Sequence, residues 1–439
     1  MIGRERNILR SLPHMDDCFY QKTTLPNGLR VLTAPMPHTR SAAVSVYVGA
    51  GSRYETEPQA GVAHFIEHLC FKGTERRPTA LEISQVVDSV GGHINAATDR
   101  ELTVFYCKVA QPYFELALDV LSDLVRRPLF TPEELEKERG VIIEELAMIG
   151  DSPAQQVDLL LDETLWPHQP LGRDVAGTEE TVRGITRDVA LDYLHDQYVP
   201  NNTVVSIAGA VTHEQVMAQV EQVFGDWPRG VPRGWFPAVN GQQSPRAAVK
   251  YKSTEQAHLS VAVRGLPMHH TDRYALSLLS VILGEGMSSR LSLELRERRA
   301  LCYDVHSYCS FFLDTGSFSL YAGVDPSKAE EALRALLAEL AKLRDEGVPD
   351  DELQRAKALA KGRILLRMED TRAVSDWLGA QELLSARIRT VDDVTARIDA
   401  VTSEDMQRVA RRLIVEDQLN LAVVGPFRSQ KRFAPLLTL

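Results

Sequence analysis

The sequence predicts an α+β protein built from two similar domains, each a mostly antiparallel β-sheet flanked by helices and related to the other by internal duplication. Apolar segments with strand-like patterning recur among longer segments of helical periodicity in both halves of the chain. The apolar strand expected at 202–211 has a counterpart 216 residues later, at 418–427, and the two apolar runs end at Gly209 and Gly425. A spacing of this size between similar elements is typical of a duplicated unit.

The expected boundary between the domains is the segment 226–246, which contains four prolines and three glycines. This composition is typical of an extended connector. We therefore expect an N-terminal domain at 1–225, a linker at 226–246 and a C-terminal domain at 247–439. Residues 1–18 have the character of a loose leader.

The elements of the first half follow from turns, caps and periodicity. Asn27 and Gly28 form a turn signal between two extended segments, which predicts a hairpin. The run 41–50 predicts a buried strand, and 93–107 predicts two extended pieces around a polar bend. The helix at 131–149 has a clear start, with Thr131 as N-cap, Pro132 at the first helical position and Glu134 completing a capping box. Further helices are expected at 79–90, 112–126, about 153–165, 178–197 and 213–225.

The second half follows the same plan. Strands are expected at 247–252, 256–264 and 418–427, and helices at 271–284, 289–299, 326–346, 350–386 and 402–413.

Composition argues against several kinds of partner. A net charge of −11 in 439 residues argues against a broad basic surface for nucleic acid, and is compatible with basic peptide ligands. The five cysteines are odd in number and scattered, which favours a reducing compartment. No apolar run has the length of a membrane span or of a secretory signal. We therefore expect a cytoplasmic protein without nucleic-acid or membrane partners.

One short motif carries most of the chemistry: His64, Glu67 and His68 form a His-x-x-Glu-His sequence, the reverse of the His-Glu-x-x-His zinc signature. Residues four apart on a helix share one side, so both imidazoles are able to reach one metal ion. The apolar residues of this segment lie on a different face, the one expected to pack; they are Val62, Phe65, Ile66 and Leu69. A core histidine beside a solvated helix face is the alternative.

A catalytic zinc ion takes three protein ligands, so a carboxylate is missing from this motif. The helix at 131–149 offers Glu138 and Glu145, which are seven residues apart and therefore lie on one face. One of the two would bind the metal while the other orients a ligand. A solvated acidic helix face is the alternative.

With these motifs the sequence resembles the inverted zincins of the pitrilysin, insulin-degrading and mitochondrial processing peptidase family. The resemblance spans about 20–425 and implies zinc bound by His64, His68 and Glu145, with Glu138 as a supporting carboxylate. The stretch 90–98 resembles the family's active-site edge strand, with Asn95 and Ala96 at the positions that hold the substrate backbone.

The second half resembles the family's Arg/Tyr motif in 287–303, with Arg296 and Tyr303 at the matching spacing. The length and the layout resemble the two-domain processing-peptidase branch, which implies a homodimer or a heterodimer with a related subunit. Glu285 replaces a residue of the glycine run found in relatives. His93 and His306 lie near the motifs without a fixed family role.

The resemblance implies a zinc endopeptidase acting on unfolded or short peptides, in which Glu67 takes a proton from a zinc-activated water. Tyr303 and Arg296 would then stabilise the oxyanion or anchor the substrate carbonyl. A non-catalytic assembly subunit is the first alternative, although a purely structural subunit has no need of an intact motif. A metal-dependent hydrolase of non-peptide substrates is the second, and the strand at Asn95 and Ala96 argues against it.

Overall fold

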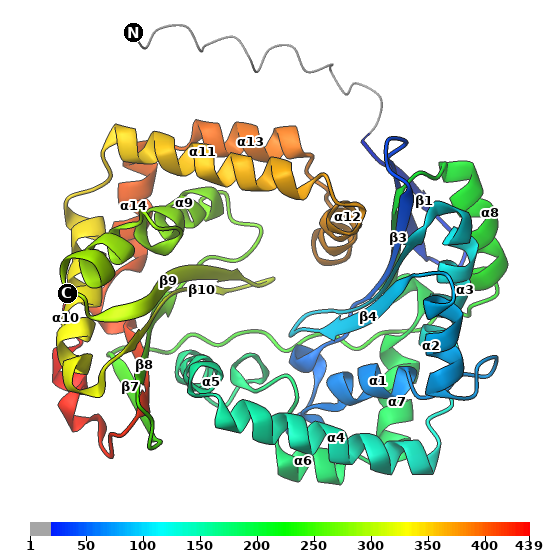
Figure 1. The fold of residues 1–439 in the computed structure, drawn as a ribbon, viewed down its shortest axis with the longest axis horizontal. Helices are drawn as coiled ribbons and strands as arrows, with labels where there is room; N and C mark the ends of the chain where they lie inside the picture. Colours follow the sequence, from blue (N-terminus) through cyan, green and yellow to red (C-terminus); the bar gives the residue numbers. More distant parts are fainter. Residues whose placement is uncertain (1–18) are drawn as a thin grey trace, which may run out of the picture.

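The computed structural model describes residues 19–439, so the expected leader at 1–18 lies outside the described residues. Two β-sheets lie on opposite sides of the molecule, and helices cover them (Figure 1). The fold is α+β with two similar halves, as the sequence predicts. Within the described part, no helix has both the length and the apolar character needed to cross a membrane.

The first sheet has six strands in the order β1-β2-β6-β3-β5-β4. Its neighbours pair antiparallel, except that β2 and β6 are parallel. Gly28 in the turn between β1 and β2 has a φ of 91°, which glycine adopts without steric cost. The predicted hairpin is therefore confirmed. The strands are β1 (Gln21–Thr24), β2 (Arg30–Pro35), β3 (Ser41–Val48), β4 (His93–Thr98), β5 (Thr103–Ala110) and β6 (Thr203–Gly209).

The second sheet repeats the first without β1, in the order β7-β11-β8-β10-β9. In the parallel pairs, Pro35 pairs with Gly209 and Tyr251 pairs with Gly425, so both strands are displaced by 216 residues. The register therefore supports the predicted duplication. Two of these strands, β9 and β10, have no counterpart among the predicted elements. The strands are β7 (Arg246–Tyr251), β8 (Ala257–Arg264), β9 (Cys302–Phe311), β10 (Gly316–Val324) and β11 (Asn420–Gly425).

Most predicted helices form, with four differences. The segment expected to be one helix at 178–197 is two, Glu179–Gly184 and Arg187–Gln197. The segment 350–386 is two helices, because the Asp370 side chain accepts the N–H groups of Arg372 and Ala373 and so caps a new helix. The segment expected to be helical at 289–299 is a π-helix at Ser292–Arg298, and α13 was not predicted. The helices of the first half are α1 (Val62–Cys70), α2 (Ala80–Asp88), α3 (Phe114–Arg126), α4 (Pro132–Asp151), α5 (Pro153–Leu165), α6 (Glu179–Gly184), α7 (Arg187–Gln197) and α8 (His213–Phe224). Those of the second half are α9 (Arg273–Gly284), α10 (Ala329–Asp345), α11 (Asp350–Arg367), α12 (Thr371–Ser385), α13 (Val391–Ala400) and α14 (Ser403–Leu413).

The two halves exchange one helix each. Helix α5 packs on β8 and β11 of the second sheet, where Val157 and Leu161 join a buried cluster with Ala262. Helix α12 packs on β3 and β6 of the first sheet, where Val374 and Leu378 contact the other buried face (Figure 1). The segment 226–245 runs between the halves without helix or strand. The predicted domain boundaries stay a prediction, since each sheet takes one covering helix from beyond that linker.

Candidate metal centre

Helix α1 carries the His-x-x-Glu-His motif and is fixed at both its start and its apolar face. It begins at Gly61, whose φ is 93°, and the buried carboxylate of Glu55 accepts the N–H groups of Gly61 at 2.9 Å and Ala63 at 2.8 Å. These bonds satisfy donors that a helix start leaves free. Burial raises the pKa of Glu55 to about 8, although the two backbone bonds oppose this shift. The predicted apolar stripe is buried, with Val62, Phe65, Ile66 and Leu69 all at most 1% exposed.

His64 and His68 project from the other side of α1 and meet Glu145 of α4. Oε2 of Glu145 lies 3.9 Å from Nε2 of His64 and 3.6 Å from Nε2 of His68. One ligand atom from each of the three residues lies within 4.8 Å of the others, and among the residues described this is the only such group of His, Cys, Asp or Glu. Two imidazole nitrogens and a carboxylate oxygen are a donor set of catalytic zinc sites, so these residues fit a zinc ion.

Glu138 lies behind His68 and fixes the orientation of its ring. Oε2 of Glu138 is 3.1 Å from Nδ1 of His68, and Oε1 of Glu138 forms an ion pair with Nζ of Lys72 at 2.8 Å. Burial raises the pKa of Glu138, but the bonds from His68 and Lys72 outweigh it, so the net pKa is lowered. The ionised carboxylate holds the proton of His68 on Nδ1, which leaves Nε2 free as a ligand.

His64 has the electrostatic state that a metal ligand needs. Burial and the neighbouring His68 lower the pKa of His64 to about 4, so its ring is neutral near pH 7. Its Nδ1 is buried and has no hydrogen-bond partner among the described residues. Unlike His68, this ring therefore has no carboxylate behind it.

Glu67 lies on α1 between the two histidines and is tied to the end of β4. The hydroxyl of Thr98 donates a 2.6 Å hydrogen bond to Oε2 of Glu67. Burial raises the pKa of Glu67, while the bond from Thr98 and the nearby His68 lower it. The net shift is upward, toward the range in which a carboxylate accepts and releases a proton near neutral pH. Sequence reasoning did not assign a role to Thr98, although it closes the stretch 90–98.

Asn95 and Ala96 lie on β4, the edge strand of the first sheet. The N–H of Ala96 donates a 2.8 Å hydrogen bond to Oδ1 of Asn95. Asn95 is exposed. The strand thus has an open edge of the kind that an added peptide strand pairs with.

Arg296 and Tyr303 are not joined to this cluster. The side-chain hydrogen bonds of Arg296 go to Glu297 and to the sulfur of Met287, and Tyr303 is 87% exposed. Within the described part of the chain, no hydrogen bond or ion pair links either residue to α1 or α4. Their roles stay predictions.

The three residues left without a role have ordinary surroundings. Glu285 pairs with Arg363 at 2.5 Å, and His93 lies near the ring of Tyr106. His306 stacks on Tyr321, with ring centroids 4.9 Å apart.

Comparison with known proteins identifies the family of this chain. Residues 30–179 match the family model described as insulinase (peptidase family M16), and residues 184–359 match the model described as peptidase M16 inactive domain. An uncharacterized zinc protease of Streptomyces coelicolor is 38% identical over 418 residues, which cover 94% of this chain and 90% of that protein. The uncharacterized zinc protease YmxG of Bacillus subtilis is 35% identical over 92% of this chain and 98% of its own length.

Solved structures share the fold. A protease from Helicobacter pylori matches with a TM-score of 0.88 at 24% identity and covers 93% of this chain and 99% of its own. A structure from Pseudomonas fluorescens, described as a peptidase M16 inactive domain, matches with a TM-score of 0.86 at 20% identity over 94% of this chain. The family models and the curated relatives decide the assignment, because together they span most of the sequence. The chain belongs to peptidase family M16.

Proposed function

We propose that the protein is a zinc-dependent endopeptidase that hydrolyses unfolded or short peptides between its two halves. The proposal is supported above all by the convergence of His64, His68 and Glu145, with Glu67 on the same helix as the two histidines. Zinc held by these residues would supply Lewis acidity, which activates water and polarises the substrate carbonyl. The relatives named as zinc proteases are consistent with this metal.

The side chains around the cluster divide the remaining work. Glu67 takes a proton from the attacking water and returns it to the leaving amine, a role that its raised pKa favours. Glu138 orients His68 through Nδ1. Thr98 holds Glu67 in place and is therefore a positioning residue.

The substrate would bind as a strand added to β4. The N–H of Ala96 donates to the Asn95 side chain, a bond that a substrate carbonyl would replace. Backbone pairing of this kind selects extended peptides rather than one sequence. By resemblance, Tyr303 and Arg296 would contact the substrate carbonyl. Dimer formation with an identical or related subunit belongs to the proposal and is measured by light scattering on the purified protein.

The test compares wild type with Glu67→Gln for zinc content and for cleavage of a panel of quenched fluorescent peptides. We expect both proteins to bind one zinc ion per chain and only the wild type to cleave. Appreciable cleavage by Glu67→Gln would remove Glu67 as the base. A zinc-loaded wild type that cleaves no peptide would favour the alternative function, a non-catalytic assembly subunit. The family model that matches residues 184–359 is described as an inactive domain, which is compatible with that alternative.

The third ligand has its own matched control on α4. Glu145→Gln is expected to lower the zinc content, whereas Glu144→Gln removes an exposed neighbouring carboxylate and is expected to leave it unchanged. The reverse result would assign the ligand to Glu144.

A further inference from the structure

A buried arginine lies where the two halves of the molecule meet. Arg53 belongs to a 3₁₀ helix at Ser52–Tyr54, and its side chain is fully buried. Its Nη1 donates to Glu101 in the turn between β4 and β5, and its Nη2 donates to Asp314 in the turn between β9 and β10. Its Nε donates at 2.9 Å to the backbone oxygen of Phe236, in the segment that connects the halves. The three charged side chains, which we call the arginine junction, therefore join one turn of each sheet.

Backbone groups complete the arginine junction. The N–H of Leu313 donates to both carboxylate oxygens of Glu101, at 3.0 and 3.1 Å. Oδ2 of Asp314 accepts the N–H of Ala238 at 2.8 Å. Each carboxylate oxygen of the junction thus accepts at least one hydrogen bond. Buried hydrogen bonds between charged groups are strong, and losing one partner leaves a charge without compensation. The junction therefore holds the two turns firmly against each other.

The turn of the first sheet begins directly after Thr98. The N–H of Arg53 donates at 2.9 Å to the backbone oxygen of Arg100 in this turn. Arg100 also forms an ion pair with Asp162 on α5, the helix that covers the second sheet. The hydroxyl of Thr98 donates at 2.6 Å to Oε2 of Glu67. A shift of the turn would therefore displace Thr98 and disturb the hydrogen bond that orients Glu67.

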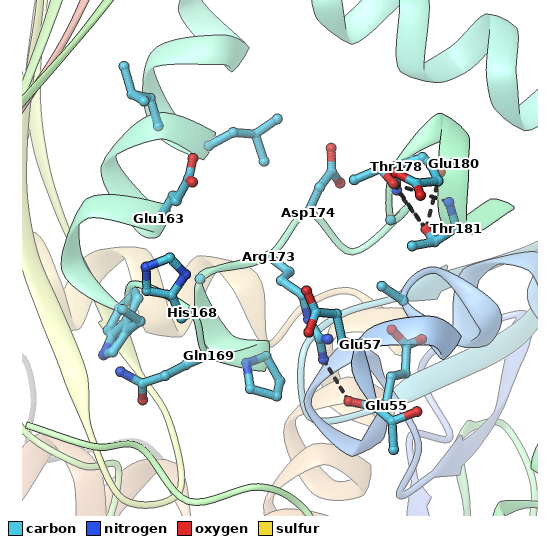
Figure 2. Close-up of a pocket in the computed structure, with 18 of the residues that line it drawn as sticks. Glu55, Glu57, Glu163, His168, Gln169, Arg173, Asp174, Thr178, Glu180 and Thr181 are labelled. Carbon is cyan, nitrogen blue, oxygen red and sulfur yellow. Dashed lines mark hydrogen bonds between the residues drawn. The ribbon is translucent and has the colours of Figure 1, made fainter.

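The segment that contains Arg53 is also connected to the helix of the metal cluster. Nη2 of Arg173 donates at 2.6 Å to the backbone oxygen of Glu55, and Figure 2 shows these two residues meeting at the wall of a pocket that both line. The carboxylate of Glu55 accepts two N–H groups at the start of α1. Arg53 is therefore linked to both elements that matter to the proposed base, namely the helix that carries Glu67 and the turn that follows Thr98.

We propose that Arg53 is a positioning residue, through which the second half of the chain holds Thr98 and thereby Glu67 in place for catalysis. Asp314 contributes the contact from the second half. The role rests on the proposed peptidase function, because it concerns the orientation of the base. It gives the second half, which contains no member of the metal cluster, a part in the chemistry of the first. A junction that only stabilises the fold is the alternative.

The test uses Asp314→Asn in the full chain. Truncation of Arg53 itself would leave two carboxylates without their cation and is expected to impair folding. Asp314→Asn keeps the size of a side chain that is 25% exposed, and Arg53 retains its bond to Glu101. We expect a folded, zinc-loaded protein whose kcat is about fivefold lower, because the orientation of the base is less well defined. KM should change by less than about twofold, because the peptide pairs with β4 before the turn.

A double-mutant cycle with Thr98→Val distinguishes positioning from a general loss of stability. If Asp314 acts through Thr98, the two losses of kcat do not combine independently, and Asp314→Asn should lower kcat by less than about twofold in the Thr98→Val background. A junction that only stabilises the fold predicts independent losses that multiply. Asp417→Asn is the control, since it removes an exposed carboxylate of the second half that has no ion pair in the described chain, and it is expected to leave kcat unchanged.

Amide hydrogen exchange measured by mass spectrometry gives a readout that needs no activity. We expect Asp314→Asn to speed exchange at 99–103 by about threefold or more and to leave α8 unchanged, while Asp417→Asn changes neither. Unchanged exchange at 99–103, an unchanged kcat or losses of kcat that multiply would overturn the proposal. A zinc-loaded wild type that cleaves no peptide would instead remove the peptidase function, and the exchange data would still decide whether the junction holds the turn.

Discussion

The hydroxyl of Thr98 donates a 2.6 Å hydrogen bond to Oε2 of Glu67. Thr98 is the last residue of β4, and Glu67 lies on α1, so the bond joins the edge strand to the helix that carries His64 and His68. The same hydroxyl lies 3.3 Å from that of Thr103 on β5. The proposed base and the proposed peptide-binding strand are therefore held in one arrangement.

Thr98→Val is expected to lower kcat by about tenfold, since the isosteric side chain removes the hydrogen bond that orients Glu67. This bond favours the ionised form, so its loss raises the pKa of Glu67 further and moves the acid limb of the pH–rate profile to higher pH. Thr98→Ser keeps the hydroxyl and should restore both quantities. An unchanged pH profile in a folded, zinc-loaded Thr98→Val protein would reduce Thr98 to a packing role.

Glu138→Gln is expected to weaken zinc binding by roughly 10- to 100-fold, because the variant loses the charge that orients His68 and pairs with Lys72. The affinity is measured by competition with a chelator. Glu133→Gln is the control, since Glu133 is an exposed residue of the same helix without an ion pair in the described chain. Equal affinities for Glu138→Gln and wild type would exclude this supporting role.

The metal-free protein should lose stability as the pH falls from about 6.5 to about 4. The pKa of His64 is lowered from 6.5 to about 4 in the fold, so the unfolded chain binds the extra proton in this window. The contribution of His64 is then on the order of a few kcal/mol at neutral pH and disappears below pH 4. The contribution of His64 is isolated by measuring the free energy of unfolding of wild type and His64→Gln in denaturant at several pH values. The other titrating groups, Glu67 included, occur in both proteins. Parallel pH dependences for the two proteins would show that His64 contributes nothing.

The sequence predicts which residues of α1 and α4 converge better than it predicts their surroundings. The four-residue spacing of His64 and His68 and the buried stripe beside them follow from helical periodicity alone. Of the two candidate carboxylates, Glu145 lies near both rings and Glu138 lies behind one of them. No local pattern indicates Thr98 or the buried Glu55, because their partners are set by how a strand and a loop meet α1.

Sequence patterns do not predict the exchange of α5 and α12 between the two halves. Periodicity shows which face of a helix is buried but not which sheet buries it. The strand β9 was missed because its exposed and half-buried residues, including Tyr303 and His306, lack a regular apolar alternation. Similarly, the capping carboxylate of Asp370 divides one predicted helix into α11 and α12.

The packing of α12 on the first sheet depends on Gly379. A Cβ atom at this position would overlap the ring of Tyr47 and lie 3.1 Å from Cβ of Ser206, so Gly379→Ala must displace the helix or the ring. We expect a destabilisation of about 1–3 kcal/mol, which is typical of overpacking in a filled interior. Gly362→Ala on α11 is the matched control: nothing lies within 4 Å of its added Cβ, and higher helix propensity should stabilise the protein by up to about 1 kcal/mol. Denaturant unfolding measures both values. If Gly379→Ala were as stable as Gly362→Ala, α12 would not be packed on β3 and β6 in solution, and the exchange of helices between the halves would be wrong.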